Sequence, residues 1–325
     1  MADEVDIIEN NLLMEHTDVL QRLLCDHTTQ KNIFWATDSY ADLGDGYQWH
    51  DPITIESITG EHGTVLQPRA VKSREEQIRR SKDKAEVFTE PWICNKQANA
   101  TDALWFGRDD VFNHVKPDNT WTSTTEKIKF PEGKTWIDYV KQNALEITCG
   151  EAPYLVSRYD TVMGHPIPVS QRIGLLDRKL RVVSENTESY EEWFQMAKEA
   201  YKATYGFEWQ GDSLLLAREA LFYTFIDYHQ DKFQEAIAQE DLNAVADIIS
   251  WNIWQMDGLK CVVPDSCHDT VSRIVNLDGT VTEQRTPCTG CNKGTMRNHN
   301  GIYCRIMDWE NSTSVRFVDL LKGVK

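Results

Sequence analysis

The sequence predicts an α/β protein that binds a small ligand at the carboxyl end of a short strand. Residues 145–159 read Leu-Glu-Ile-Thr-Cys-Gly-Glu-Ala-Pro-Tyr-Leu-Val-Ser-Arg-Tyr, which is an apolar strand, a Cys149-Gly150 turn and an apolar run that can start a helix. Ligands of open α/β sheets bind outside the carboxyl ends of strands, where glycine lets the backbone come close. Further along, Ser189-x-x-Glu192 is a capping box before a helical stripe of aromatic residues, and four clustered cysteines follow near residue 290.

Length and charge limit the classes of function. The 325 residues suffice for one α/β domain with appendages or for two domains. No apolar run approaches the roughly 20 residues of a membrane span, and the first residues do not form a signal peptide, so we expect a cytoplasmic protein that does not contact a membrane. The net charge of −17 means that DNA binding needs a local basic patch or a partner.

The first 83 residues are expected to form a helical and loop region that ends in a basic helix. Apolar residues at near-helical spacing in residues 1–30 predict one or two amphipathic helices that pack on the body or on a second subunit. Residues 69–84 gather basic side chains in an otherwise acidic chain. These are candidates for contacts to DNA phosphates, with a solvated helix face as the alternative; the candidates are Arg74, Arg79, Arg80 and Lys82.

The glycine turn resembles a cofactor-binding motif. The order Glu146-x-x-Cys149-Gly150-x-Ala152-x-Tyr154-Leu155 resembles the Asp-x-x-Cys-Gly-x-Gly-x-Phe-Leu turn of adenine-specific DNA methyltransferases. The resemblance implies a Rossmann-like methyltransferase fold and S-adenosylmethionine held by Glu146, Cys149, Gly150 and Ala152. Ala152 departs from the usual glycine. A strand, a glycine turn and a helix also occur together for structural reasons alone.

A segment before the turn adds to this resemblance. Phe88-Thr89-x-Pro91 resembles the Phe-Thr-Pro segment that packs against the methionine part of the cofactor, with Glu90 inserted. The resemblance implies cofactor contacts for Phe88, Thr89 and Pro91. Alternatively, Thr89 caps a helix that starts near Pro91.

Two acids after the turn complete the resemblance. It implies that Glu208 binds the ribose hydroxyls, with Asp212 as second choice, because a carboxylate can accept from two hydroxyls. Residues 252–257 resemble the Asn-Ile-x-x-x-Asp segment whose acid accepts from the adenine amine, which implies roles for Asn252 and Asp257. A Rossmann dehydrogenase is disfavoured because Gly-x-Gly-x-x-Gly is absent from the sequence.

The clustered cysteines predict a closed structural zinc site. Cys288 and Cys291 have the two-residue spacing that lets two thiolates bind one ion, and we expect Cys267 and Cys304 to complete a tetrahedron. Possible substitutes are Cys261, His268 and His299. The alternative is a set of reduced cysteines in a β-hairpin; the remaining Cys25, Cys94 and Cys149 are scattered and not expected to form disulfides.

These observations predict three regions and one leading function. We expect an N-terminal region at 1–83, a methyltransferase-like cofactor domain at 84–260, and a zinc-ribbon-like insertion with a final strand at 261–325. The catalytic Asp/Asn/Ser-Pro-Pro-aromatic tetrapeptide of the family is absent, because the sequence contains no adjacent prolines. The expected function is S-adenosylmethionine-dependent adenine methylation in a restriction-modification system, with a second catalytic or restriction subunit as partner. The alternatives are an inactive interaction protein, such as an acidic decoy or a regulatory subunit, and a zinc-stabilised scaffold.

Overall fold

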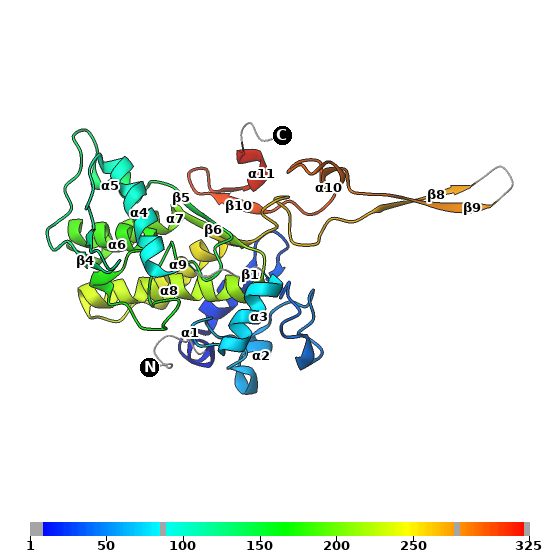
Figure 1. Cartoon of the computed structure of the whole chain (residues 1–325), viewed down its shortest axis with the longest axis horizontal. Helices are drawn as coiled ribbons and strands as arrows, with labels where there is room; N and C mark the ends of the chain where they lie inside the picture. Colours follow the sequence, from blue (N-terminus) through cyan, green and yellow to red (C-terminus); the bar gives the residue numbers. More distant parts are fainter. Residues whose placement is uncertain (1–8, 85–88, 276–279, 322–325) are drawn as a thin grey trace.

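The computed structural model describes residues 9–84, 89–275 and 280–321, which form a body with one projecting hairpin (Figure 1). The helices are α1 Glu9–Leu24, α2 Ile55–Ile58, α3 Arg74–Lys84, α4 Pro91–Phe106, α5 Trp136–Val140, α6 Leu175–Asn186, α7 Tyr190–Lys202, α8 Gly211–Phe233, α9 Gln239–Asn252, α10 Thr289–Lys293 and α11 Phe317–Leu320. The strands are β1 Cys25–Asp26, β2 Lys31–Asn32, β3 Asn113–Val115, β4 Trp121–Ser123, β5 Ala144–Ile147, β6 Thr204–Glu208, β7 Ile253–Gln255, β8 Thr270–Val275, β9 Val281–Thr286, β10 Arg305–Asp308 and β11 Thr313–Arg316.

A parallel sheet organises the body. Its order is β5-β6-β7, with Ala144 opposite Thr204 and Gly206 opposite Ile253. Parallel neighbours need crossover connections, and here α6 and α7 connect β5 to β6 while α8 and α9 connect β6 to β7. The α/β class and the strand at residue 145 are therefore confirmed, whereas the finer methyltransferase fold stays a prediction.

Local sequence signals explain where several elements begin and end. The Ser189 side chain accepts a hydrogen bond from the N–H of Glu192, which confirms Ser189 as the N-cap of α7. Helix α4 begins with Pro91, whose missing N–H costs nothing in a first turn. Its N-cap is Glu90, and no side chain caps it, so the predicted alternative of a Thr89 cap is wrong.

The apolar run after the glycine turn does not start a helix, contrary to expectation. No helix is assigned between Glu151 and Tyr159. Pro153 cannot donate a backbone hydrogen bond, and the buried Glu146 side chain accepts the N–H groups of Tyr154 and Leu155 at 3.4 and 3.2 Å. The Leu155 N–H is shared, because it also donates to the Ala152 carbonyl at 3.0 Å.

The N-terminal helix belongs to the main core. Leu12, Val19 and Leu23 of α1 are buried in the same apolar cluster as Leu221 of α8 and Val245 of α9. The expected amphipathic helix therefore packs on the body, burying apolar area at about 25 cal/mol per Å². No helix of the described residues is long and apolar enough to cross a membrane.

The C-terminal residues form a small second core and a long hairpin. Cys304, Ile306 and Phe317 pack against Phe207 and Trp254 of the sheet. The antiparallel pair β8–β9 extends away from the body, and its residues are exposed (Figure 1).

Candidate ligand pocket and metal centre

A pocket of about 440 Å³ lies at the carboxyl end of β5. The turn after β5 forms one wall, and residues of α4 form another. Its lining includes Thr89, Gln97, Ala98, Thr101, Glu146, Thr148, Gly150, Glu151 and Tyr154. Its position is the edge of a parallel sheet at which ligands of α/β proteins bind.

The turn beside the pocket has a strained backbone. Thr148, Gly150 and Ala152 all have positive φ, at 49°, 54° and 60°. Only glycine adopts this region freely, and a β-branched residue such as Thr148 is an outlier there. Strain of about 1–3 kcal/mol per residue persists only where the surroundings enforce it, and it gathers at ligand sites. Ala152, which stands where the resembling family has glycine, is in the conformation that favours glycine.

Glu208 joins the turn to the neighbouring strand. It is the last residue of β6 and is buried, and its Oε2 accepts the N–H of Gly150 at 2.9 Å. Its Oε1 accepts the N–H groups of Trp209 and Gln210 at 2.9 and 3.3 Å. A carboxylate has about four acceptor sites, so these three donors leave one. Glu208 itself is not among the residues that line the pocket. Burial raises the pKa of Glu208, and these three donors oppose that rise.

The pocket is acidic. Glu146, Glu151 and Glu208 are all buried around the turn, and the lining contains no Lys or Arg among the described residues. Burial raises the pKa of Glu146 well above its ordinary value, and the nearby charge of Glu208 raises it further. A positively charged ligand would favour the ionised forms of these acids, whereas a phosphate would meet repulsion.

Of the predicted cofactor residues, the structure brings some together around this pocket. Thr89, Glu146, Cys149 and Gly150 line it. Cys149 is 2% exposed, and burial raises the pKa of its thiol well above the ordinary value, so this thiol is not reactive. Ala152 is fully buried beneath the turn. Phe88 lies outside the described residues, and Pro91 is not part of the lining.

The remaining predicted cofactor residues, Glu208, Asn252 and Asp257, are not part of the pocket lining. Asn252 is wholly engaged: its amide donates to the carbonyl oxygens of Tyr201, Lys202 and Thr204 and accepts from Trp309 Nε1. These hydrogen bonds give Asn252 a structural role, and both ends of its amide are already bonded within the protein. Asp257 lies beyond β7 at the same sheet edge as Gly150, 3% exposed, with a 3.0 Å ion pair to Lys260 Nζ. Asp212, the second choice for the ribose, is fully buried.

Asp212 pairs with one of the predicted DNA contacts. Arg80 Nη2 lies 2.6 Å from Asp212 Oδ2, and the two side chains are 2% and 0% exposed. Tyr40 also donates to Asp212 at 2.9 Å. Arg80 is therefore not placed to contact DNA, contrary to expectation, because its face of α3 packs on the body.

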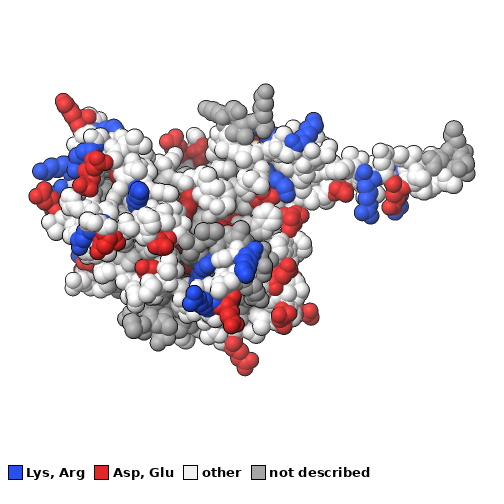
Figure 2. All heavy atoms as spheres, viewed as in Figure 1, with Lys and Arg blue, Asp and Glu red and all other residues white. Residues whose placement is uncertain are grey.

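The other basic residues of α3 present a mixed surface. Arg74 and Lys82 are exposed, while the side chain of Arg79 is outside the described part of the structure. Figure 2 shows basic and acidic atoms side by side over α3. The buried Arg80 does not contribute to the charge of this surface.

A second group of chemically active side chains lies at the base of the hairpin. The ligand atoms of Cys267, Cys288, Cys291 and His299 all lie within 4.8 Å of one another. Nδ1 of His299 is 3.4, 3.5 and 3.6 Å from the three sulfurs. In a tetrahedral zinc site, bond lengths of about 2.3 Å to S and 2.0–2.1 Å to N separate S from N by about 3.6 Å. This Cys3His group can therefore bind a metal ion such as zinc.

The surroundings of the group fix its geometry. His299 Nε2 lies 2.6 Å from the Thr295 carbonyl, which can only accept, so the ring proton is on Nε2 and Nδ1 is free to bind metal. The N–H of Asn300 donates to Cys288 Sγ at 3.3 Å. A Cβ on Gly290 would come within 2.7 Å of the His299 ring, and one on Gly301 within 2.9 Å of Cys267 Sγ. Both glycines are needed for the close approach.

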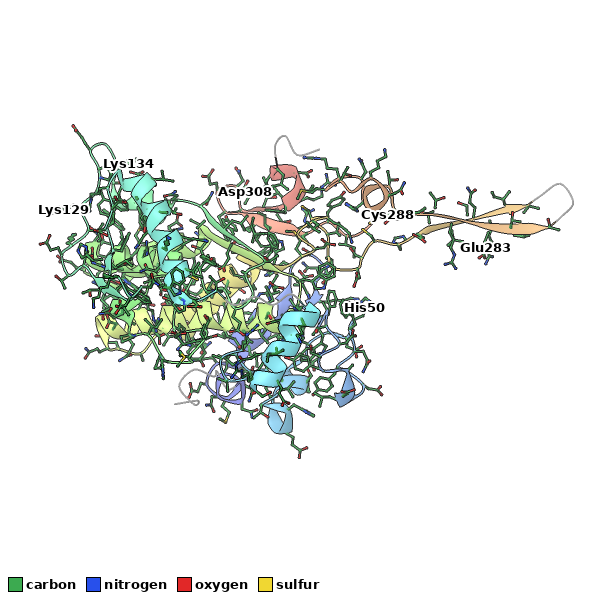
Figure 3. All side chains as sticks on the ribbon, viewed as in Figure 1. His50, Lys129, Lys134, Glu283, Cys288 and Asp308 are labelled. Atoms are coloured by element: carbon green, nitrogen blue, oxygen red, sulfur yellow. The ribbon has the colours of Figure 1, made fainter. Side chains whose placement is uncertain are left out.

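Cys304 is not part of the metal-binding group, which corrects the predicted ligand set. Its thiol is fully buried in the second core and donates to the Gln255 carbonyl at 3.3 Å. Strand β10 begins directly after it, so this position serves the packing of β10 on the sheet. The fourth member of the group is His299, one of the substitutes that the sequence allowed. Figure 3 shows Cys288 where the hairpin leaves the body.

Sequence reasoning missed other residues of the pocket. Glu151 accepts the N–H of Arg69 at 2.8 Å and the hydroxyl of Tyr159 at 2.6 Å, which ties the turn to the segment before α3. Gln97 and Thr101 of α4 lie one helical turn apart on the face toward the pocket. The sequence signal that could have identified them is their i, i+4 spacing in a helix expected to start near Pro91, because this spacing places both side chains on one face.

The fold and these two groups define the class of protein: a mixed α/β protein with a parallel sheet, an acidic pocket at its carboxyl edge and a Cys3His metal-binding group. Comparison with protein-family models, curated proteins and solved structures finds no match.

Proposed function

We propose that the pocket binds S-adenosylmethionine and that the chain acts in the methylation of adenine in DNA, as part of a restriction-modification system. The single observation that carries the proposal is the order of groups along the sheet edge. In the adjacent parallel strands, Gly150 follows β5, Glu208 ends β6 and Asp257 follows β7. This is the order in which the resembling family places its turn, its ribose acid and its adenine acid.

The charge of the pocket supports a cationic ligand. S-adenosylmethionine carries a sulfonium and an ammonium group, and both would lie favourably near Glu146 and Glu151. Thr89 and Tyr154 lie on the pocket wall, where they would contact the methionine part. Glu208 keeps one acceptor site for a ribose hydroxyl. When bound, this cofactor would supply the methyl group.

The catalytic tetrapeptide and the DNA contacts would come in part from outside these 325 residues. Among the described side chains of α3, Arg74 and Lys82 are basic and exposed, and they would approach phosphates. Zinc in the Cys3His group would be structural, because four protein ligands leave no open position for a reaction.

Calorimetric titration tests cofactor binding. S-adenosylmethionine is titrated into wild type, Gly150→Ala and the control Gly60→Ala. Both glycines have positive φ, 54° and 64°, with open space where a Cβ would be, so the backbone strain of the two variants is matched. Only Gly150→Ala places a methyl group at the pocket. The proposal requires binding by wild type and Gly60→Ala and at least tenfold weaker binding by Gly150→Ala, about 1.4 kcal/mol.

The net charge of −17 favours a second candidate, an acidic protein that occupies the DNA site of a restriction or modification enzyme. This candidate predicts competition with DNA for such an enzyme. Equal competition by wild type and Gly150→Ala, together with no heat from S-adenosylmethionine, would favour it over the methyltransferase proposal.

A further inference from the structure

Strand β5 has an open edge. In the sheet order β5-β6-β7, β5 pairs only with β6 among the described residues. The N–H of Ala144 donates to the carbonyl of Ala203, which sets the alternation of the ladder. In a parallel pair, successive residues direct their backbone groups to opposite sides. The N–H and C=O groups of Leu145 and Ile147 therefore point away from β6, to the open edge.

The side chains at this edge are apolar and exposed. Leu145 is 43% exposed and Ile147 is 66% exposed, although both lie in a strand of the central sheet. Parallel sheets are normally covered, and an uncovered apolar edge strand invites pairing. An occupant that covers both side chains would remove this apolar area from water.

The pocket next to Leu145 has both apolar and charged walls. This pocket of about 570 Å³ lies over the face of the sheet, since Leu145 of β5, Tyr205 of β6 and Trp254 of β7 all line it. The C-terminal elements add apolar side chains such as Phe317, and the charged lining residues are Lys141, Glu199, Lys202, Asp308 and Glu310. At the other end of β5, Ile147 lines the acidic pocket described above. Each end of the edge strand therefore borders a pocket.

We propose that the β5 edge binds an extended apolar segment of a partner polypeptide by strand addition. The outward-facing N–H groups of Leu145 and Ile147 and the C=O of Leu145 determine the occupant, since a β-strand matches their spacing along the edge. The C=O of Ile147 already accepts from Thr148 Oγ1 at 2.7 Å. Alternate side chains of the segment would contact Leu145 and the apolar part of the 570 Å³ pocket. One end of the segment reaches the rim of the acidic pocket at Ile147. The inference does not depend on which ligand that pocket binds.

The test tethers a strand to the full chain. A flexible glycine-serine linker and a segment of alternating valine and threonine are added after Lys325, which raises the local concentration of the strand to the order of mM. The matched control carries the same linker, with prolines in place of the threonines. Backbone amide exchange at Leu145 and Ile147 is then measured without any small ligand.

The proposal predicts that exchange at these two amides slows by about tenfold or more with the alternating segment and not with the proline control. In the alternating fusion, Ile147→Lys reduces this protection, whereas Ile137→Lys, at an exposed position on α5, does not. Equal exchange in both fusions would overturn the proposal. Protection in the unmodified chain that rises with its concentration would assign the edge to a second copy and also overturn it.

Discussion

The backbone N–H of Gly150 donates to Glu208 Oε2 at 2.9 Å, which ties the turn after β5 to the end of β6. The same carboxylate accepts the N–H groups of Trp209 and Gln210. One buried side chain therefore fixes the relative position of two strand ends at the pocket.

Glu208→Ala is predicted to destabilise the protein. It leaves three N–H groups without their acceptor, and each unsatisfied buried group costs about 1–3 kcal/mol. We expect a loss of at least that size in the free energy of unfolding, measured by urea denaturation. The control Glu191→Ala lies on the exposed face of α7 and should change stability little. A loss no larger than that of the control would show that Glu208 does not hold the turn.

Glu146 should make stability depend on pH. Burial raises its folded-state pKa well above the ordinary 4.5. The folded state then holds the proton more tightly, so the contribution of Glu146 is fully present below pH 4.5 and is lost as pH rises through the folded pKa. As pH rises from 4.5 through the folded-state pKa of Glu146, wild type should lose stability relative to Glu146→Gln. A difference between the two proteins that does not change with pH would contradict the burial of an ionisable Glu146.

Lys179 should make the stability of the protein rise with pH, over a higher pH range than Glu146. Its ammonium is buried without a carboxylate partner among the described contacts, and donates to the carbonyls of Gln142 and Ala203 at 2.6 and 2.9 Å. Burial lowers its pKa from 10.5 to about 7. Between these values the unfolded state binds more protons, so stability should rise with pH by up to about 1.4 kcal/mol per pH unit relative to Lys179→Met. Parallel pH curves for the two proteins would refute this.

Substitutions at Arg80 and Arg74 should differ in their effect on the stability of the protein. Arg80→Met leaves the buried Asp212 carboxylate without its ion-pair partner, which costs about 3–5 kcal/mol. Arg74→Met removes an exposed charge and should leave stability nearly unchanged. If α3 contacts DNA, Arg74→Met also weakens binding, an effect measured by fluorescence anisotropy at fixed salt. Equal stability of the two variants would contradict the observed burial of Arg80.

The metal-binding group should hold one ion through three sulfurs and one nitrogen. Elemental analysis is predicted to find stoichiometric zinc in wild type and in Cys304→Ala, and to find less in Cys291→Ser and His299→Ala. Cobalt substitution reports the ligand set independently, because thiolate-to-cobalt bands should weaken in Cys291→Ser and be unaffected by Cys304→Ala. Metal loss in Cys304→Ala with retention in His299→Ala would restore the ligand set expected from sequence.

The sequence was informative where a signal is local. The strand at Leu145, the cap at Ser189 and the acid at the end of β6 depend on neighbouring residues, and the structure has all three. The choice of His299 over Cys304 depends on how residues 288–304 fold back on Cys267, which spacing along the chain does not encode. Arg80 shows the same limit, because its partner Asp212 lies 132 residues away.

A crystal structure of the chain grown with S-adenosylmethionine tests the central claim most directly. The account predicts electron density for the cofactor at the carboxyl ends of β5 and β6, with its ribose beside Glu208 and its methionine part beside Thr89 and Glu146. An empty pocket at a saturating concentration of S-adenosylmethionine, or cofactor density at another place on the molecule, would contradict it.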